Sequence, residues 1–269
     1  MALSLGEAWN ETAQFVKREA GLLFPLALLL IALPIAIVGA ISPPQPPPGQ
    51  LPPLGLWTAL LPVAFLLGMI GNIAISYLAL RPNTSVGEAL SRGLKRLLPL
   101  VGAVLLLMLG FLLLAVVLAT IVAALAGGVG GPQPGPGASA AMAILFVIML
   151  PIMVYLAARL LLTTAVAAAE EAGPIGLIRR SWQLTGGHVW TVIGFILLMA
   201  IAVLVVMLAV GLVAGSLIVL LAGQPQPGSL SAFLMLLVSA ALNTVITVYV
   251  TSMVARIYAQ LARGSTSGT

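Results

Sequence analysis

The chain has 269 residues, of which 61% are apolar and only 6% are charged, and its formal net charge is +5. A water-soluble domain needs roughly a quarter of its residues charged, so this composition excludes an ordinary soluble protein and indicates a surface that faces lipid. The sequence contains neither cysteine nor aspartate, which excludes disulfides and thiol chemistry and leaves six glutamates as the acidic residues.

Long uncharged stretches predict the membrane-spanning helices. Three of them, at 20–80, 97–158 and 189–255, are each roughly sixty residues long, which is enough for two crossings of about 20 residues and a turn. A segment rich in proline and glycine interrupts each stretch, as expected of a turn; these segments lie at 42–53, 127–137 and 222–229. We therefore predict six crossings, at 21–41, 54–80, 97–126, 140–158, 189–222 and 230–255.

The positions of the cations predict the orientation. All 11 lysines and arginines lie at the amino terminus, between hairpins or near the end of an even-numbered crossing, and the hairpin tips have none. By the positive-inside bias, both termini and both inter-hairpin loops face the cytoplasm. The first apolar run resembles a signal peptide, but its leader holds three glutamates and the run is longer than a typical signal core. We expect a retained first helix.

A repeated motif organises the chain. The segment SLGEAW at 4–9 reappears as SVGEAL at 85–90, and in both a serine precedes a glutamate by three residues, the arrangement of a capping box. Each copy begins an amphipathic segment suited to the membrane interface. A third amphipathic segment begins at Pro174 and ends at the TGG of 185–187. Each repeat is then an interfacial helix, a crossing, a Pro-rich tip and a return crossing.

The predicted fold is therefore all-α: a polytopic membrane protein whose six crossings form three repeated hairpins in one bundle. Each hairpin is preceded by an amphipathic interfacial helix. We expect a single domain over 1–269, with repeat units at roughly 1–81, 82–159 and 170–263. The same-sense repetition favours duplication of a hairpin over inverted halves.

The run AAAEEAGPIGLIRRSWQLTGGHVWTVIGFILL at 167–198 resembles the signature of the glycerophosphoryl diester phosphodiesterase membrane-domain family. An acidic residue precedes a Gly-Pro turn, and an arginine-bearing segment then leads into a hydrophobic helix. The matching residues are Glu170, Gly173, Pro174, Arg179, Arg180, Ser181, Trp182, Leu184, Thr185 and Gly187. The resemblance implies a bacterial inner-membrane protein. We expect a stand-alone membrane module without the soluble phosphodiesterase domain of some relatives, so that family's hydrolytic activity is not carried over.

The single histidine, His188, is the obvious candidate for chemistry. A catalytic histidine needs a nucleophile or an orienting carboxylate, and a zinc site needs three or four ligands. No glutamate lies inside a predicted crossing. We therefore predict no catalytic residue, no metal site, no cofactor and no enzymatic activity, and we interpret His188 as an interface residue beside Trp190.

Arginines near the ends of the return crossings have two interpretations. Arg81, Arg159 and Arg256 either bind an anionic head group at the cytoplasmic mouth of the bundle or anchor helix ends by snorkelling. We favour anchoring for Arg81 and Arg256. Both interpretations stay open for Arg159, which has apolar residues on either side. Further candidates for anionic head groups lie on the interfacial segments: Arg179 and Arg180, with Lys95 and Arg96 also expected against anionic lipid.

Two amides, Asn72 and Asn243, lie inside predicted crossings. They either form hydrogen bonds between helices or coordinate an ion.

The leading hypothesis for the chain is a non-enzymatic scaffold or accessory protein that engages anionic lipid of the cytoplasmic leaflet or a membrane or soluble partner protein. The alternative is a facilitator-type transporter or a lipid-handling or glycerophosphodiester-handling protein, and an intramembrane hydrolase ranks third. We expect no nucleic-acid partner.

Overall fold

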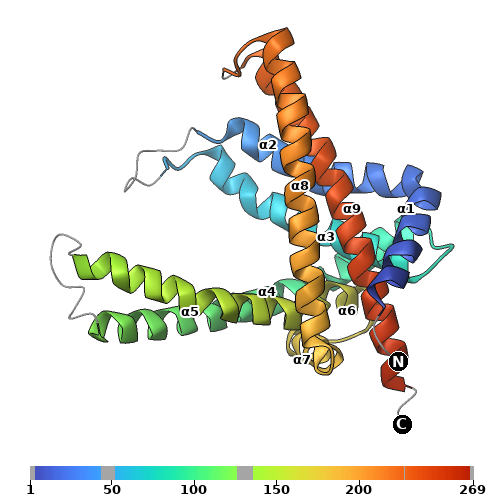
Figure 1. The fold of residues 1–269 in the computed structure, drawn as a ribbon. Coiled ribbons are helices and arrows are strands. Elements are labelled where there is room, and N and C mark those ends of the chain that lie inside the picture. The colour runs from blue at the N-terminus through green and yellow to red at the C-terminus, as the bar shows by residue number, and fades with distance from the viewer. Residues whose placement is uncertain (1–3, 44–51, 126–135, 227, 267–269) are drawn as a thin grey trace.

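The computed structural model describes residues 4–43, 52–125, 136–226 and 228–266, and the elements in these ranges are helices (Figure 1). The predicted tips at 42–53 and 127–137 lie largely outside the described residues. In chain order the elements are α1 (Leu5–Ala27), the π-helix η1 (Leu28–Ala32), α2 (Leu33–Ile41), α3 (Leu56–Leu80), α4 (Val86–Leu125), α5 (Pro136–Leu160), α6 (Thr163–Ala169), α7 (Pro174–Thr185), α8 (Val189–Ala222) and α9 (Leu230–Thr266).

Six helical segments of the described chain are long and apolar enough to cross a membrane. They agree with the six predicted crossings, and the bounds of the fifth coincide with those of α8. By helix length and hydropathy the chain is therefore a multi-pass membrane protein. The two termini lie at the same end of the molecule (Figure 1), where the backbone N–H of Ser4 donates to the side-chain oxygen of Gln260 at 3.3 Å.

The amphipathic segments begin where the sequence predicts. Ser85 and Glu88 form a reciprocal capping box, because the hydroxyl of Ser85 accepts from the N–H of Glu88 at 3.2 Å and the carboxylate of Glu88 accepts from the N–H of Ser85 at 3.3 Å. Ser4 caps α1 through its hydroxyl, which accepts from the N–H of Glu7 at 3.3 Å, but this box is not reciprocal because the N–H of Ser4 donates to Gln260. The prediction of three separate interfacial helices is wrong for the first two, since α1 and α4 continue without a break into the crossings. A separate helix forms only in the third copy, where Gly186 follows the last residue of α7.

The first crossing is interrupted within its helical segment. Pro25 lies inside α1, where it removes a backbone donor, and the π-helix η1 follows it directly. Both features are established causes of helix bending, and the segment from α1 to α2 changes direction along its length (Figure 1).

Consecutive crossings pack as pairs, with α2 against α3, α4 against α5 and α8 against α9. These pairs do not form the single bundle that we predicted: they spread apart from a common base, and α8 and α9 run steeply across α4 and α5 (Figure 1). Along α8 the buried residues are Val192 and Phe195, both near the base. The physical reason is that lipid tails solvate apolar side chains as well as another helix does, so no hydrophobic force draws the outer halves together.

The core lies at the base, around α6. This short helix, in a stretch to which we assigned no structure, is almost entirely buried. Helix α3 approaches α4 so closely that a Cβ at Gly93 would lie 2.9 Å from the carbonyl oxygen of Ile70. Helix α1 packs against α9. Asn72 accepts a hydrogen bond from Thr251 on α9 at 2.8 Å, in agreement with the predicted interhelical role, whereas Asn243 accepts from its own helix.

Candidate functional site

Most of the charged contacts at the base involve five residues, which we call the charged base: Arg92, Arg96, Glu170, Glu171 and Arg180. Helix α4 supplies Arg92 and Arg96, four residues apart and therefore on one helical face. The loop between α6 and α7 supplies both glutamates, and α7 supplies Arg180. The charged base therefore joins α4 to the loop between α6 and α7, with Arg92 and Glu171 79 positions apart, and joins that loop to the helix that follows it.

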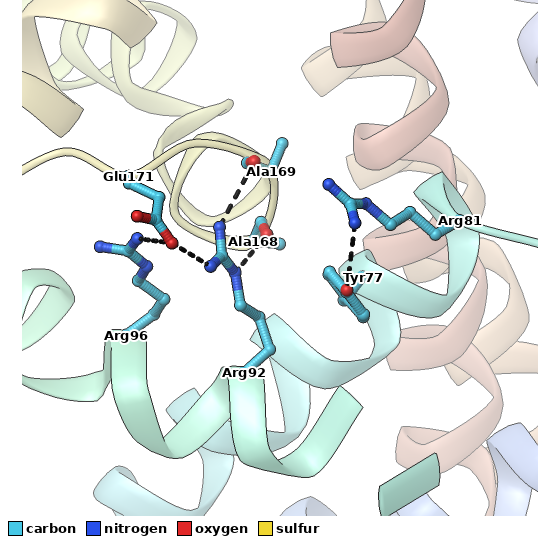
Figure 2. A network of polar contacts seen from close by, with 7 residues as sticks. All are labelled: Tyr77, Arg81, Arg92, Arg96, Ala168, Ala169 and Glu171. Carbon is cyan, nitrogen blue, oxygen red and sulfur yellow. Dashed lines mark hydrogen bonds and ion pairs between the residues drawn. The ribbon is translucent and has the colours of Figure 1, made fainter. Parts of the chain in front are cut away.

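One half of the charged base is centred on Glu171 (Figure 2). The same carboxylate oxygen of Glu171 accepts from Arg92 at 2.8 Å and lies 2.9 Å from a guanidinium nitrogen of Arg96. Arg92 also donates to the carbonyl oxygens of Ala168 at 3.0 Å and Ala169 at 3.4 Å. These carbonyls belong to the last turn of α6, where a cation complements the helix dipole. Arg92 therefore holds the C-terminal end of α6 against α4.

The two arginines also change the acidity of Glu171. The hydrogen bond from Arg92 and the positive charge of Arg96 favour the ionised form and hold the pKa of Glu171 below its usual range. The Arg96 side chain is only 13% exposed, whereas that of Glu171 is 78% exposed. We expected Arg96 to lie against anionic lipid, but its side chain turns inward and pairs with Glu171. That expectation is therefore wrong, because the amphipathic pattern of one segment does not reveal an acidic partner from a distant one. Lys95, the neighbouring cation, is exposed.

The other half of the charged base is centred on Glu170. One oxygen of this carboxylate accepts from the Nε of Arg180 at 2.9 Å and from the hydroxyl of Tyr258 at 2.8 Å. Tyr258 lies on α9, so Glu170 connects α7 to the last crossing. Arg180 is thus ion-paired within the chain, while its neighbour Arg179 is exposed.

Arg159 lies at the end of α5, among aromatic side chains. Its guanidinium stacks on the rings of Trp182 and Tyr155, at 4.8 and 5.2 Å from the ring centroids, and donates to the hydroxyl of Tyr155 and the carbonyl of Trp182. The carbonyl of Arg159 accepts from the hydroxyl of Ser181 at 2.7 Å, and Thr185 lies 3.4 Å from the same oxygen. These contacts join the end of α5 to α7, so in this structure Arg159 connects two helices of the chain.

The other two arginines both lie beside α1. Arg256 lies over the ring of Phe15 and 3.9 Å from a carboxylate oxygen of Glu11, and its interpretation as an anchor stays a prediction. Arg81 is exposed and contacts Tyr77 through a long hydrogen bond of 3.4 Å and through the ring face (Figure 2).

The remaining motif positions serve the fold of α7. Gly173 is the N-cap, Pro174 begins the helix and Leu184 is buried beneath it, while Gly187 is exposed in the turn before α8. His188 is the N-cap residue of α8, and its side chain makes no capping hydrogen bond. The described residues contain no group of three or more histidine and acidic side chains placed to hold a metal ion.

A pocket of about 320 Å³ lies beside Arg81, between α1, the end of α3 and the loop before α4. Its polar lining comes from both ends of the predicted first hairpin. Glu19 faces the pocket from α1, and Arg81 and the loop residues after it face the pocket from the end of α3. The complete lining is Phe15, Glu19, Leu22, Leu78, Arg81, Pro82, Asn83, Thr84 and Ser85.

The sequence analysis missed Arg92, Glu171, Tyr258 and Glu19 as members of these sites. A signal was present for the first two. Arg92 and Arg96 form an arginine pair on one face of an amphipathic segment, and Glu170 and Glu171 are the acidic residues of the second inter-hairpin loop. Tyr258 and Glu19 gave no comparable signal.

Comparison with protein families matches residues 3–261 to a domain of unknown function, DUF7847. No curated protein and no solved structure matches the chain. The resemblance to glycerophosphoryl diester phosphodiesterase membrane domains stays a prediction.

Proposed function

This chain belongs to the DUF7847 family, and we propose that it is a non-enzymatic scaffold or accessory protein of the bacterial inner membrane, which engages lipid or a partner protein. The observation that carries the proposal is that the charged contacts gather at the base of the molecule, whereas the exposed apolar side chains lie along the crossings. Charged groups at the base form ion pairs that join segments of the chain to one another. Apolar side chains of α4, α5 and α8 stay exposed along the spreading crossings.

The charged base supports a structural use of the ionisable groups. Both glutamates of the loop between α6 and α7, Glu170 and Glu171, are engaged by arginines of this chain. Arg92 and Arg96 stabilise the ionised form of Glu171, so this carboxylate is a weak base for chemistry.

The exposed helices support engagement of lipid or of another membrane protein. On α8 the residues exposed by more than half include Leu212, at 72%. Such a surface is suited to lipid tails, and equally to a partner helix, since packing in lipid is driven by shape. The resemblance noted at 167–198 supports the inner membrane as the location, and the shared position of both termini supports the predicted cytoplasmic termini.

The proposal is tested on purified protein in liposomes and on native membrane extracts. In liposomes we expect neither hydrolysis nor flux of glycerophosphodiesters, and turnover by the protein alone would refute the proposal. In extracts we expect a retained lipid or a membrane protein at fixed stoichiometry. A photo-cross-linker at Leu212 should capture that partner or lipid, whereas one at the buried Val192 should not. If the extracted protein carries neither partner nor specific lipid, the scaffold role is wrong.

The second candidate is a facilitator-type transporter or a lipid-handling protein. The pocket beside Arg81 favours it, because a charged pocket next to apolar helices is suited to an amphiphile. Substrate-specific flux in the same liposomes, lost on Arg81→Gln, would establish this candidate in place of the scaffold.

A further inference from the structure

The pocket beside Arg81 joins the two charges that bound the first uncharged stretch. Glu19 is the last charged residue before it and Arg81 the first after it. The two are 62 positions apart in sequence, yet both line one pocket of about 320 Å³. Since the chain between them is apolar enough to cross the membrane twice, the pocket lies where the two ends of that apolar stretch meet.

The pocket has an apolar side and a polar side. Phe15, Leu22 and Leu78 supply apolar walls, and Leu22 is 44% exposed, so the wall continues onto the outer surface of α1. The polar side includes the loop that follows Arg81. The hydroxyl of Thr84 donates to the carbonyl of Arg81 at 2.8 Å, which fixes the backbone that carries the guanidinium. An amphiphile would meet matching chemistry at both ends of such a pocket.

The charges that line the pocket are balanced. Its lining contains one cation, Arg81, and one carboxylate, Glu19. Glu19 accepts from the exposed Arg18 on one oxygen, Oε1, and a carboxylate has about four acceptor positions on its two oxygens. Arg81 contacts Tyr77 through the ring face and a long hydrogen bond, while a guanidinium has five N–H donors. Both groups retain capacity for a ligand.

We propose that this pocket binds the head group of a phospholipid of the ethanolamine type, with the phosphate at Arg81 and the ammonium at Glu19. The acyl chains then run along Leu22. An anionic glycerol head group offers Glu19 no cation, and a choline ammonium has no N–H to donate to the carboxylate, so ethanolamine is the best match. The proposal deepens the lipid engagement of the proposed function and rests on it.

The test measures lipid retention by native mass spectrometry. The full chain is incubated in detergent with equimolar phosphatidylethanolamine, phosphatidylcholine and phosphatidylglycerol of matched acyl chains. We expect preferential retention of the ethanolamine lipid. Arg81→Gln should reduce it about tenfold, as expected from losing one charge-assisted contact, and Glu19→Gln should abolish the preference over the other two lipids. Lys95→Gln removes an exposed cation outside the pocket and should leave the retention of the ethanolamine lipid unchanged.

Several results would overturn this site. Equal retention of the three lipids would show that the protein does not select the ethanolamine head group. Unchanged retention in Arg81→Gln would show that the lipid is not bound in this pocket. Displacement by soluble glycerophosphoethanolamine at concentrations similar to the lipid would show that the phosphate ester, and not the lipid, is the ligand. Size-exclusion chromatography confirms that each variant is folded. The flux test shares Arg81→Gln with this one, whereas the cross-linking at Leu212 and Val192 probes another part of the molecule. The cross-linking result therefore distinguishes loss of this site from failure of the scaffold role.

Discussion

Replacing Arg92 with methionine tests whether the charged base stabilises the fold. Methionine keeps much of the apolar stem but removes every donor. Arg92 is only 17% exposed, and it donates to the carbonyl of Ala168 at 3.0 Å and to that of Ala169 at 3.4 Å. A hydrogen bond to a charged group contributes about 1.5–3 kcal/mol. The longer contact and the helix-dipole interaction add up to about 1 kcal/mol together.

The ion pair with Glu171 adds little to this sum, because the carboxylate is 78% exposed and such pairs contribute about 0–1 kcal/mol. Arg96 also continues to pair with Glu171 in the variant. We therefore expect Arg92→Met to lower the free energy of unfolding by about 2–4 kcal/mol.

The matched control is Lys95→Met, which removes the same charge from an exposed position on the same helix. It should change stability by no more than about 0.5 kcal/mol. Unfolding is followed through tryptophan fluorescence in mixed micelles titrated with denaturing detergent. If Arg92→Met and Lys95→Met unfold at the same detergent fraction, the charged base does not hold α6 in place.

Three further predictions concern packing and pH. Gly93→Ala should destabilise the protein, despite the roughly 1 kcal/mol that alanine gains over glycine in a helix, because its Cβ meets the backbone of α3; Gly110→Ala, with open space around it, should be neutral or stabilising in the same unfolding assay. Asn72→Ala should cost about 0.6 kcal/mol through loss of its bond from Thr251, and a double-mutant cycle with Thr251→Val that gives no coupling would contradict this. The lowered pKa of Glu171 contributes stability that is present above the usual glutamate range and lost as the pH falls through the lowered value, so unfolding curves between pH 7 and 3 should shift less in Glu171→Gln.

Local features of the fold were predictable from the sequence because local physics determines them. The capping box at Ser85 and Glu88 depends on two residues three positions apart. The bounds of α8 follow from an uncharged run between two breakers, Gly187 and Gly223. The amphipathic segment at the start of α4 was misjudged: its polarity changes at Leu97 and Pro99 follows two residues later, yet the helix continues through the proline.

Long-range features were not predictable, because a single sequence does not reveal which distant residues meet. Arg92 and Glu171 are 79 positions apart, and either could equally have faced water. Helix α6 is rich in alanine and therefore a good helix former, yet its burial at the centre of the base depends on neighbours from four other helices, α3, α4, α7 and α9. The spreading of the hairpins depends on the solvent: apolar periodicity identifies crossings, but in lipid it does not determine what they pack against.

The contact between α1 and α9 sets an order of events during synthesis. The first crossing leaves the ribosome about 200 residues before its main partner does, which at 5–20 residues per second is a wait of roughly 10 to 40 seconds. Throughout that interval α1, with Glu7, Glu11 and Glu19 on its leading segment, has no α9 beside it. Helix α3 packs against α1, η1 and α2 and is synthesised well before α9, so it provides the contact that holds the first crossing until the last one arrives.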